Sequence, residues 1–235
     1  MKVKGAAVDA LGFTNSDDNQ HVREYLLCLM VAAAVTYLAT PAVRALALRA
    51  GAYTHIRKRD VHTVITPRWG GLGMYVGFLA AFAIAWKLPM MNAVFDDLGT
   101  AFGLLGATTL LVIIGLIDDR FDLDAPTKFA GQAMAAGILA WQGIGFIWLP
   151  LGNATVLDPL TSTLLTLLVV LVCINAVNFV DGLDGLASGI VLVGAAASFV
   201  YSYLLSVHFG FERATLSTLI SAILTGVCLG FLPHN

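Results

Sequence analysis

The stretch TSTLLTLLVVLVCINAVNFVDGLDGLASG, residues 161–189, passes from a long apolar run into a polar segment rich in aspartate and glycine. The run 161–177 has no charged residue and approaches the roughly 20 residues that a helix needs to cross a bilayer. Asp181 and Asp184 follow it, each with a glycine after it, and the apolar run 187–207 comes next. This pattern predicts two membrane helices joined by a short connection that carries polar side chains.

The composition of the whole chain also indicates a membrane protein. Of the 235 residues, 58% are hydrophobic and 12% are charged, whereas soluble domains carry about 25% charged residues. We therefore predict an all-α, polytopic membrane fold. The net charge of -2 gives no indication of a nucleic-acid partner. Residues 1–24 are polar and lack the apolar core of a signal peptide, so we divide the chain into a polar tail, 1–24, and a transmembrane domain, 25–235.

Seven apolar runs are candidate membrane spans. They are 25–48, 71–88, 99–117, 129–149, 161–177, 187–207 and 214–232. Three cysteines lie inside such runs, and we interpret them as small packing residues rather than as disulfides or metal ligands. They are Cys28, Cys173 and Cys228.

Basic residues predict which way the spans are oriented. The connection 49–70 contains five Lys or Arg residues, and the connection 89–98 contains none. Connections rich in Lys and Arg stay on the cytoplasmic side, so we expect 49–70 inside and the N-terminus outside. Alternation then places 118–128 and 178–186 inside as well. The sequence therefore predicts that three polar connections meet at one face of the membrane.

The connection after the third span begins with two adjacent carboxylates, Asp118 and Asp119. A carboxylate at the C-terminal end of a helix interacts unfavourably with the helix dipole, so helix stability does not explain acidic residues at this position. Two adjacent carboxylates can hold a hard cation such as Mg²⁺, which prefers oxygen ligands. A solvated acidic turn is the alternative. Lys128 begins the next span, where its ammonium group either extends to the membrane surface or meets a phosphate.

The polar segment 175–189 contains four candidate ligand-binding residues. They are Asn175, Asn178, Asp181 and Asp184. Amides and carboxylates supply donors and oxygen ligands, and glycines let a ligand approach the backbone closely. Simple helix capping by Asp184 is an alternative for that one residue. The spacing of acids in a calcium loop of the EF type is absent. We interpret the segment as one wall of a binding site.

The first cytoplasmic connection carries basic candidates for binding phosphate. They are Arg57, Arg59, His62 and Arg68. Pro67 and the Gly70–Gly71 pair shape the entry to the second span. A simple anchor on anionic lipids is the alternative for this cluster. Basic groups that face acidic ones suit a phosphorylated substrate that binds together with its metal.

These polar groups suit phosphoryl transfer between a soluble phosphate compound and a lipid phosphate, because that reaction needs positioning and charge more than covalent help. An ion-coupled secondary transporter is an alternative from another class. Transporter sites usually lie near the middle of the membrane, whereas these acids lie at the ends of spans. A non-catalytic membrane partner also remains open.

Two segments resemble a known family. GLIDDRFDLDAPTKFAGQ, 115–132, and NAVNFVDGLDGLASG, 175–189, are similar to signature segments of the polyprenyl-phosphate N-acetylhexosamine-1-phosphate transferases. The pattern H-x4-P-R-x-G-G from His62 to Gly71 resembles the first cytoplasmic loop of that family. The short connection after the acidic pair resembles the UDP-GlcNAc type of transferase more than the phospho-MurNAc-pentapeptide type.

The resemblance implies transfer of a sugar-1-phosphate, GlcNAc-1-phosphate in this subtype, from a UDP-sugar to a polyprenyl phosphate, with release of UMP. It implies Mg²⁺, with Mn²⁺ as an alternative ion, and an active face on the cytoplasmic side of a bacterial plasma membrane, among membrane lipids. The product would initiate a cell-envelope glycan. A homodimer remains open as the assembly.

By motif position, the resemblance also implies roles for particular residues. Asp118 and Asp119 match the catalytic acidic pair and, with Asn178, the metal ligands. Lys128 matches a lysine near the phosphates. Asp181 and Asp184 match residues that meet the pyrophosphate or the nucleoside.

One difference from the family affects the expected activity. Family members continue after the seventh span with a cytoplasmic aspartate segment and a histidine-rich loop. FLPHN, the last five residues here, resembles the lead-in to that aspartate segment. We therefore expect that the 235-residue polypeptide is truncated at its C-terminus and inactive by itself.

Overall fold

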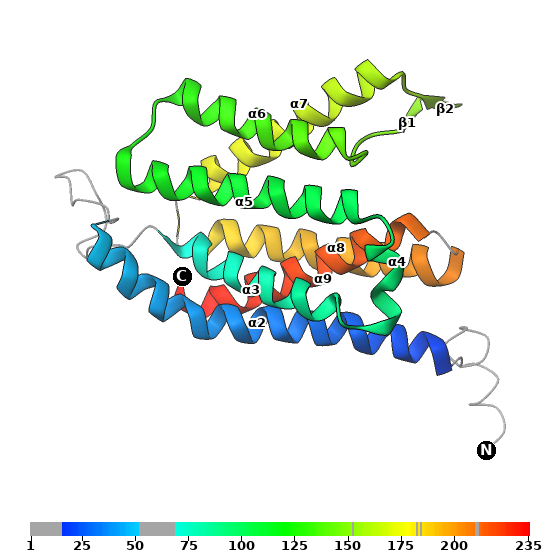
Figure 1. The fold of residues 1–235 in the computed structure, drawn as a ribbon, viewed down its shortest axis with the longest axis horizontal. Coiled ribbons are helices and arrows are strands. Elements are labelled where there is room, and N and C mark those ends of the chain that lie inside the picture. Colours follow the sequence, from blue (N-terminus) through cyan, green and yellow to red (C-terminus); the bar gives the residue numbers. More distant parts are fainter. Residues whose placement is uncertain (1–15, 52–68, 152, 182, 184, 210–211) are drawn as a thin grey trace. The chain divides into compact units, whose positions relative to one another are not determined.

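The computed structural model describes residues 16–51, 69–151, 153–181, 183, 185–209 and 212–235. Figure 1 shows its elements, which are mostly long helices. The helices are α2 (Ser16–Ala50), α3 (Gly70–Ala85), α4 (Asn92–Phe95), α5 (Leu98–Phe121), α6 (Ala125–Trp141), α7 (Pro159–Val180), α8 (Leu186–Phe209) and α9 (Glu212–Phe231). Two single turns of 3-10 helix, η1 (Pro89–Met91) and η2 (Leu232–His234), and two strands, β1 (Trp148–Leu151) and β2 (Asn153–Val156), complete the described elements.

The predicted all-α, polytopic membrane fold is confirmed. Each of the seven predicted spans overlaps a helix of the structure. Within the described part of the chain, five helices are long and apolar enough to cross a membrane. These are Val22–Ala50, Leu98–Phe121, Pro159–Val180, Leu186–Ser206 and Thr215–His234. α3 is apolar but shorter, and α6 has 17 residues. The orientation of the N-terminus stays a prediction.

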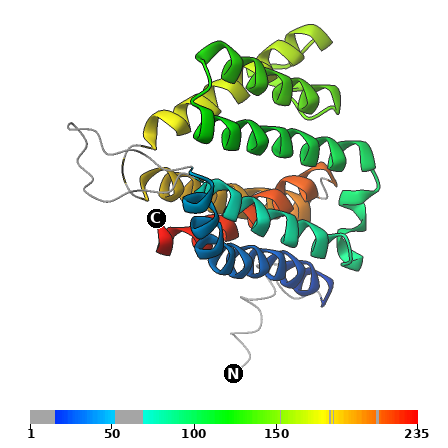
Figure 2. The same cartoon turned by 60° about the vertical axis from the view of Figure 1, so that its left-hand side comes forward.

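The first of two compact units comprises the described residues within 1–40, 73–96 and 188–235. In this unit α3 and α9 pack closely against α2 (Figures 1 and 2). A side-chain carbon added at Gly226 of α9 would meet the Leu29 carbonyl oxygen, and one added at Gly77 of α3 would meet the Thr36 hydroxyl. The glycines in such contact with α2 are Gly73, Gly77, Gly226 and Gly230. Pairs of small residues four apart let membrane helices approach to backbone contact.

The second unit comprises the described residues within 41–72 and 97–187. It contains α5, α6 and α7, and α6 contacts both of the others. Figures 1 and 2 show the three helices side by side. α5 and α6 are antiparallel, and at one end the Thr100 hydroxyl donates to the Gln142 carbonyl at 3.2 Å. At the other end lie the C-termini of α5 and α7 and the N-terminus of α6.

An Asp-x-x-Thr sequence precedes each helix of the second unit. The pairs are Asp97–Thr100, Asp124–Thr127 and Asp158–Thr161. At α5, the Asp97 carboxylate accepts the backbone N–H groups of Gly99 at 3.1 Å and Thr100 at 3.4 Å. At each of the three aspartates, a hydrogen bond from the threonine side chain is the largest of the causes that lower the pKa of the carboxyl. At α5 and α7 the aspartate accepts backbone N–H groups of the first turn, so the sequence marks where these two helices begin. The Asp124 side chain makes no such capping hydrogen bond at the start of α6.

The predicted span 129–149 is too long, because α6 ends at Trp141. Gly143 follows with φ of 76°, a left-handed conformation that ends helices. Aromatic and β-branched residues then favour an extended chain, and β1 pairs with β2 in an antiparallel hairpin. The hairpin is attached to α7, because the Ser162 hydroxyl donates to the Phe146 carbonyl at 2.5 Å and the Phe146 N–H donates to Thr166 Oγ1 at 3.2 Å.

The predicted polar tail, 1–24, overlaps the first helix, because α2 begins at Ser16. The residues from Ser16 onward include good helix formers and continue directly into the apolar run, so the helix extends before the membrane span starts. Residues 1–15 lie outside the described part of the chain.

Candidate active site

Asp118 lies in the last turn of α5, where the helix ends in a tight turn. Its backbone carbonyl accepts the Asp122 N–H at 2.8 Å, and its side-chain Oδ1 accepts the Leu123 N–H at 3.0 Å. Asp122 has φ of 48°, a left-handed conformation that aspartate tolerates better than most residues. The turn thus holds Asp118 by its backbone and by its side chain. Asp119 follows it and is partly exposed.

Lys128 reaches back from the first turn of α6 to the acidic pair. Its Nζ lies 2.7 Å from Asp118 Oδ1, and the two side chains are 39% and 28% exposed. The ion pair places the Lys128 charge beside Asp118, and its contact with a phosphate stays a prediction. Partly exposed ion pairs contribute about 0–1 kcal/mol to stability, so this pair matters more for orientation. Both side-chain contacts use Oδ1, and Asp118 Oδ2 takes part in neither.

Asn175 connects α7 to α6. Its Nδ2 donates to Gln132 Oε1 at 2.9 Å and to the Leu171 carbonyl at 2.8 Å. Both of these hydrogen bonds from Asn175 Nδ2 therefore run to the protein itself. Gln132 lies one turn after Lys128 on α6 and is buried. The sequence interpretation did not select Gln132. A polar side chain within an otherwise uncharged membrane helix, four residues after a site lysine, was the signal that could have found it.

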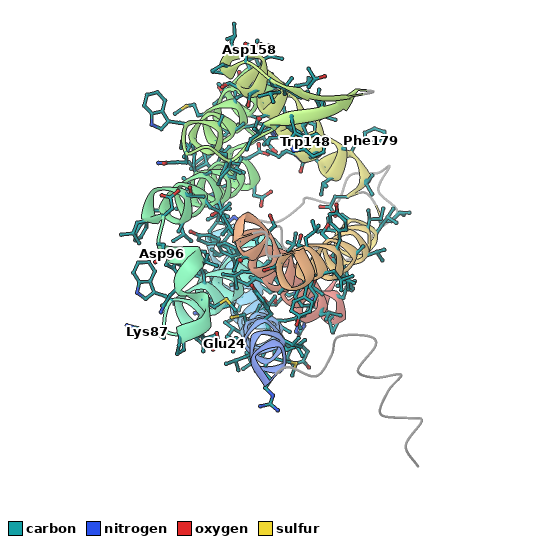
Figure 3. The ribbon with its side chains drawn as sticks, turned by 90° about the vertical axis from the view of Figure 1, so that its right-hand side faces the viewer. Glu24, Lys87, Asp96, Trp148, Asp158 and Phe179 are labelled. Atoms are coloured by element: carbon teal, nitrogen blue, oxygen red, sulfur yellow. The ribbon has the colours of Figure 1, made fainter. Side chains whose placement is uncertain are left out.

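Asn178 and Asp181 lie at the C-terminal end of α7. Both are exposed, and the Asp181 N–H donates to the Val177 carbonyl at 3.0 Å, which closes the last turn of the helix. Phe179, between them, is 90% exposed, and Figure 3 shows it at the opposite end of α7 from Asp158. The polar side chains at this end are therefore accessible to a ligand.

The remaining predicted site residues lie outside the described part of the chain. They are Arg57, Arg59, His62 and Arg68 of the basic connection, and Asp184. The structure thus brings together Asp118 with Lys128, and Asn175 with Gln132, at the end of the second unit where two of the three predicted polar connections lie.

The donors at this end suit Mg²⁺ that arrives with a phosphate. The carboxylates of Asp118 and Asp119 and the exposed amide of Asn178 offer the oxygen ligands that Mg²⁺ takes, and Mg²⁺ commonly uses one or two protein carboxylates while substrate phosphates complete its shell. Among the described residues, no three His, Cys, Asp or Glu side chains form a closed metal cluster.

Comparison with known proteins agrees with this arrangement. Residues 101–235 match the model of the family described as glycosyl transferase family 4. The chain is 47% identical over 219 residues to the decaprenyl-phosphate N-acetylglucosaminephosphotransferase of Mycolicibacterium smegmatis, an alignment that covers 91% of this chain and 54% of the relative. It is 43% identical over 238 residues to the protein of the same name from Mycobacterium tuberculosis, covering 99% of this chain and 59% of the relative.

A more distant relative is the probable undecaprenyl-phosphate N-acetylglucosaminyl 1-phosphate transferase of Bacillus subtilis, 28% identical over 119 residues, which are 51% of this chain and 31% of the relative. The chain thus spans little more than half the length of the mycobacterial relatives. The matched region includes the acidic pair, Lys128, Gln132 and the polar end of α7. The family match and the mycobacterial identities together show that this multi-pass membrane chain belongs to glycosyl transferase family 4.

Proposed function

We propose that the chain carries part of the active site of a transferase that moves a sugar-1-phosphate from a UDP-sugar to a polyprenyl phosphate. GlcNAc-1-phosphate is the group we expect, because the mycobacterial and Bacillus relatives are named for N-acetylglucosamine and a polyprenyl phosphate. We place the reaction at the cytoplasmic face of a bacterial plasma membrane, where the basic connection 49–70 is expected.

The reaction exchanges one phosphoanhydride for another. An oxygen of the lipid phosphate attacks the phosphorus that carries the sugar, the bond from that phosphorus to the oxygen of the UMP phosphate breaks, and UMP leaves. A phosphate monoester has its second pKa near 6, so the attacking group is already mostly dianionic at neutral pH. A general base would therefore add little, and repulsion between the anions is the main obstacle.

The described residues can reduce this repulsion. Asp118, Asp119 and Asn178 would hold Mg²⁺, with Mn²⁺ as an alternative, and the ion would supply positive charge beside the phosphates. Lys128, held at Asp118, adds a second positive charge. Asp181 and the exposed end of α7 offer polar groups to the pyrophosphate or the nucleoside. Arg57, Arg59, His62, Arg68 and Asp184 complete the proposed set by motif position.

One observation carries the proposal. The 2.7 Å contact between Lys128 and Asp118 gathers a lysine and an acidic pair at the end of a membrane unit where an exposed amide and an exposed carboxylate also end a helix. A site with both signs of charge at a membrane surface suits a metal, a pyrophosphate and a lipid phosphate together. No observation of comparable strength favours a transporter.

A chimera tests the function directly. The matched region of the Mycolicibacterium smegmatis relative is replaced by the corresponding residues of this chain, and the protein is incubated with UDP-[³H]GlcNAc, decaprenyl phosphate and Mg²⁺. We expect labelled lipid to form, to disappear with EDTA and to return with added Mg²⁺. Asp118→Asn or Asp119→Asn should lower the rate roughly 10²-fold or more, because each removes a carboxylate that would hold Mg²⁺ beside the phosphates. The 235-residue chain is assayed alone in parallel.

The matched control is Asp122→Asn in the same turn. It removes one charge, and asparagine keeps the left-handed conformation at this position, so the rate should change little. A chimera that makes no labelled lipid while the intact relative does would refute the proposed function. Equal rates for the Asp118→Asn, Asp119→Asn and Asp122→Asn variants would refute the role of the acidic pair.

A further inference from the structure

One face of α6 contacts both neighbouring helices of the second unit. Lys128 and Gln132 are four residues apart, so they lie on the same side of the helix about 6 Å apart along its axis. Lys128 contacts Asp118 of α5, and Gln132 contacts Asn175 of α7. Two successive turns of α6 therefore connect the acidic pair to the helix that carries the exposed polar residues.

The burial and hydrogen bonding of Gln132 indicate that its side chain holds α6 and α7 together. Gln132 is 8% exposed, and a buried amide is costly unless its polar atoms are hydrogen-bonded. Its Oε1 accepts from Asn175 Nδ2 at 2.9 Å. Gly131, beside it, faces α5, where an added side-chain carbon would meet Ile114, so α6 is also held close to α5 at this level.

We propose that Gln132 is a positioning residue for the transfer reaction. It contacts no substrate itself, and it fixes the rotation and height of the last turns of α7 through Asn175. Asn178 and Asp181 follow Asn175 by three and six residues, so their positions relative to Asp118 depend on this hydrogen bond. The catalytic part of this inference rests on the proposed function, and the geometric part does not.

The same geometry assigns Asn175 to this pair. Its amide group donates to Gln132 of α6 and to the Leu171 carbonyl of α7. Through the first of these bonds, α6 holds Asn175, and with it the end of α7, in place. Misplacement of catalytic groups by about 1 Å can cost about 10²-fold in rate. Loss of the bond between Gln132 and Asn175 is therefore expected to lower kcat through Asn178, a proposed metal ligand, and to raise KM to a smaller extent through Asp181.

Hydrogen–deuterium exchange on the 235-residue chain in nanodiscs tests the geometric part. In Gln132→Leu, which keeps the approximate length of the side chain without polar atoms, backbone amides of 176–181 should exchange about threefold faster or more. The melting temperature should be unchanged or raised, because leucine suits a membrane helix. Met134→Leu, at a position 62% exposed on the same helix, is the control and should leave exchange unchanged.

The double variant Gln132→Asn with Asn175→Gln keeps one donor, one acceptor and the summed length of the two side chains, so it should restore slow exchange at 176–181. Unchanged exchange in Gln132→Leu would overturn the proposal. A uniform increase over all of α6 and α7 would also overturn it, because it would indicate general loosening rather than positioning.

The same variants in the chimera test the catalytic part. Gln132→Leu should lower kcat about tenfold or more, with a smaller rise in KM for UDP-GlcNAc through Asp181, and the double variant should recover the rate. Unchanged kcat beside faster exchange would overturn the catalytic role. If the unsubstituted chimera is inactive, the proposed function fails, and the exchange measurement still decides whether Gln132 positions α7.

Discussion

At the scale of single residues, the candidate site depends on a few side chains with more than one contact. Asp118 uses the same oxygen for the Leu123 N–H and for Lys128, so the end of α5, the turn and the start of α6 converge on one carboxylate. Its second oxygen is in neither contact. One carboxylate can thus shape the turn and still offer a ligand atom to a metal.

Replacement of Lys128 should separate binding from stability. We expect Lys128→Met to raise KM for UDP-GlcNAc about tenfold, since a hydrogen bond to a charged group is worth about 1.5–3 kcal/mol. The melting temperature should change little, because a partly exposed ion pair contributes little to stability. Steady-state kinetics in the chimera and thermal unfolding of the chain measure the two effects.

Lys87→Met is the control, because Lys87 is an exposed lysine of the first unit, as Figure 3 shows, and no part of the proposed site. An increase in KM of the same size in both variants would show that general loss of positive charge, rather than the lysine at the acidic pair, weakens binding.

At the scale of elements, helix packing in the first unit depends on small residues. An added carbon at Gly226 would meet a backbone carbonyl of α2, which cannot rotate away as a side chain can. We expect Gly226→Ala to reduce the free energy of unfolding by about 1–3 kcal/mol, as for other overpacked sites. Titration of unfolding in mixed micelles with SDS measures this loss.

Gly194 in α8 supplies the comparison, because nothing lies within 4 Å of a side-chain carbon added there. Gly194→Ala should be neutral or stabilising by up to about 1 kcal/mol, since alanine favours a helix more than glycine does. Equal changes in the free energy of unfolding for Gly226→Ala and Gly194→Ala would contradict the claim that Gly226 is needed for the close contact between α9 and α2.

The aspartate caps of α5 and α7 predict an acid dependence. Their pKa values lie below the ordinary value of about 3.9 for an unfolded chain. The stabilisation that the ionised caps give to the folded protein is therefore complete at pH values above the pKa of the unfolded chain. It is lost as the pH falls through the lower pKa of the caps in the folded protein. We expect the double variant Asp97→Asn with Asp158→Asn to lose less stability than the parent chain between about pH 5 and pH 3. Thermal unfolding across that range measures the difference, and parallel curves would contradict it.

At the scale of the whole molecule, the sequence predicted the seven helices of 16 or more residues in the described part of the chain better than where each one ends. Apolar length alone located the seven helices, because a membrane span must satisfy its backbone internally. Apolar length could not show that Gly143 would end α6. The residues before and after Gly143 are both mainly apolar, so the helix and the extended segment that follows it look alike until the left-handed conformation of Gly143 is known. The strand pairing of 148–156 was missed for the same reason.

The candidate site was predictable to the extent that polar residues stand out in an apolar chain. Asp118, Lys128 and Asn175 were selected from the sequence, and the structure gives each a partner. The pairing of Asn175 with Gln132 could not be predicted, because it depends on the rotation of two helices about their axes. Gln132 stands out in the sequence as a polar residue, but the sequence does not show which helix its side chain faces.

The orientation of the chain in the membrane is a prediction about the whole molecule. In a Cys173→Ser background, we expect a membrane-impermeant maleimide to label Val156→Cys in intact cells, because the hairpin is expected outside. Ala125→Cys, at the start of α6, should react only after the cells are permeabilised. Cys28 and Cys228 are buried and should stay unreactive. The reverse labelling pattern would place the acidic pair on the outer face and exclude a cytoplasmic UDP-sugar as its substrate.

The short turn between α5 and α6 also bears on the order in which the site is assembled. Helices joined by three residues make local contacts, and local contacts form faster than contacts between distant parts of a chain. During synthesis, α5, the turn and α6 emerge before α7, so Asp118 and Lys128 can meet while Asn175 is still inside the ribosome. The contact between Asp118 and Lys128 can therefore form within one inserting helical hairpin. α7 then brings Asn175 to the site when it packs against α6, whose surface is already in place.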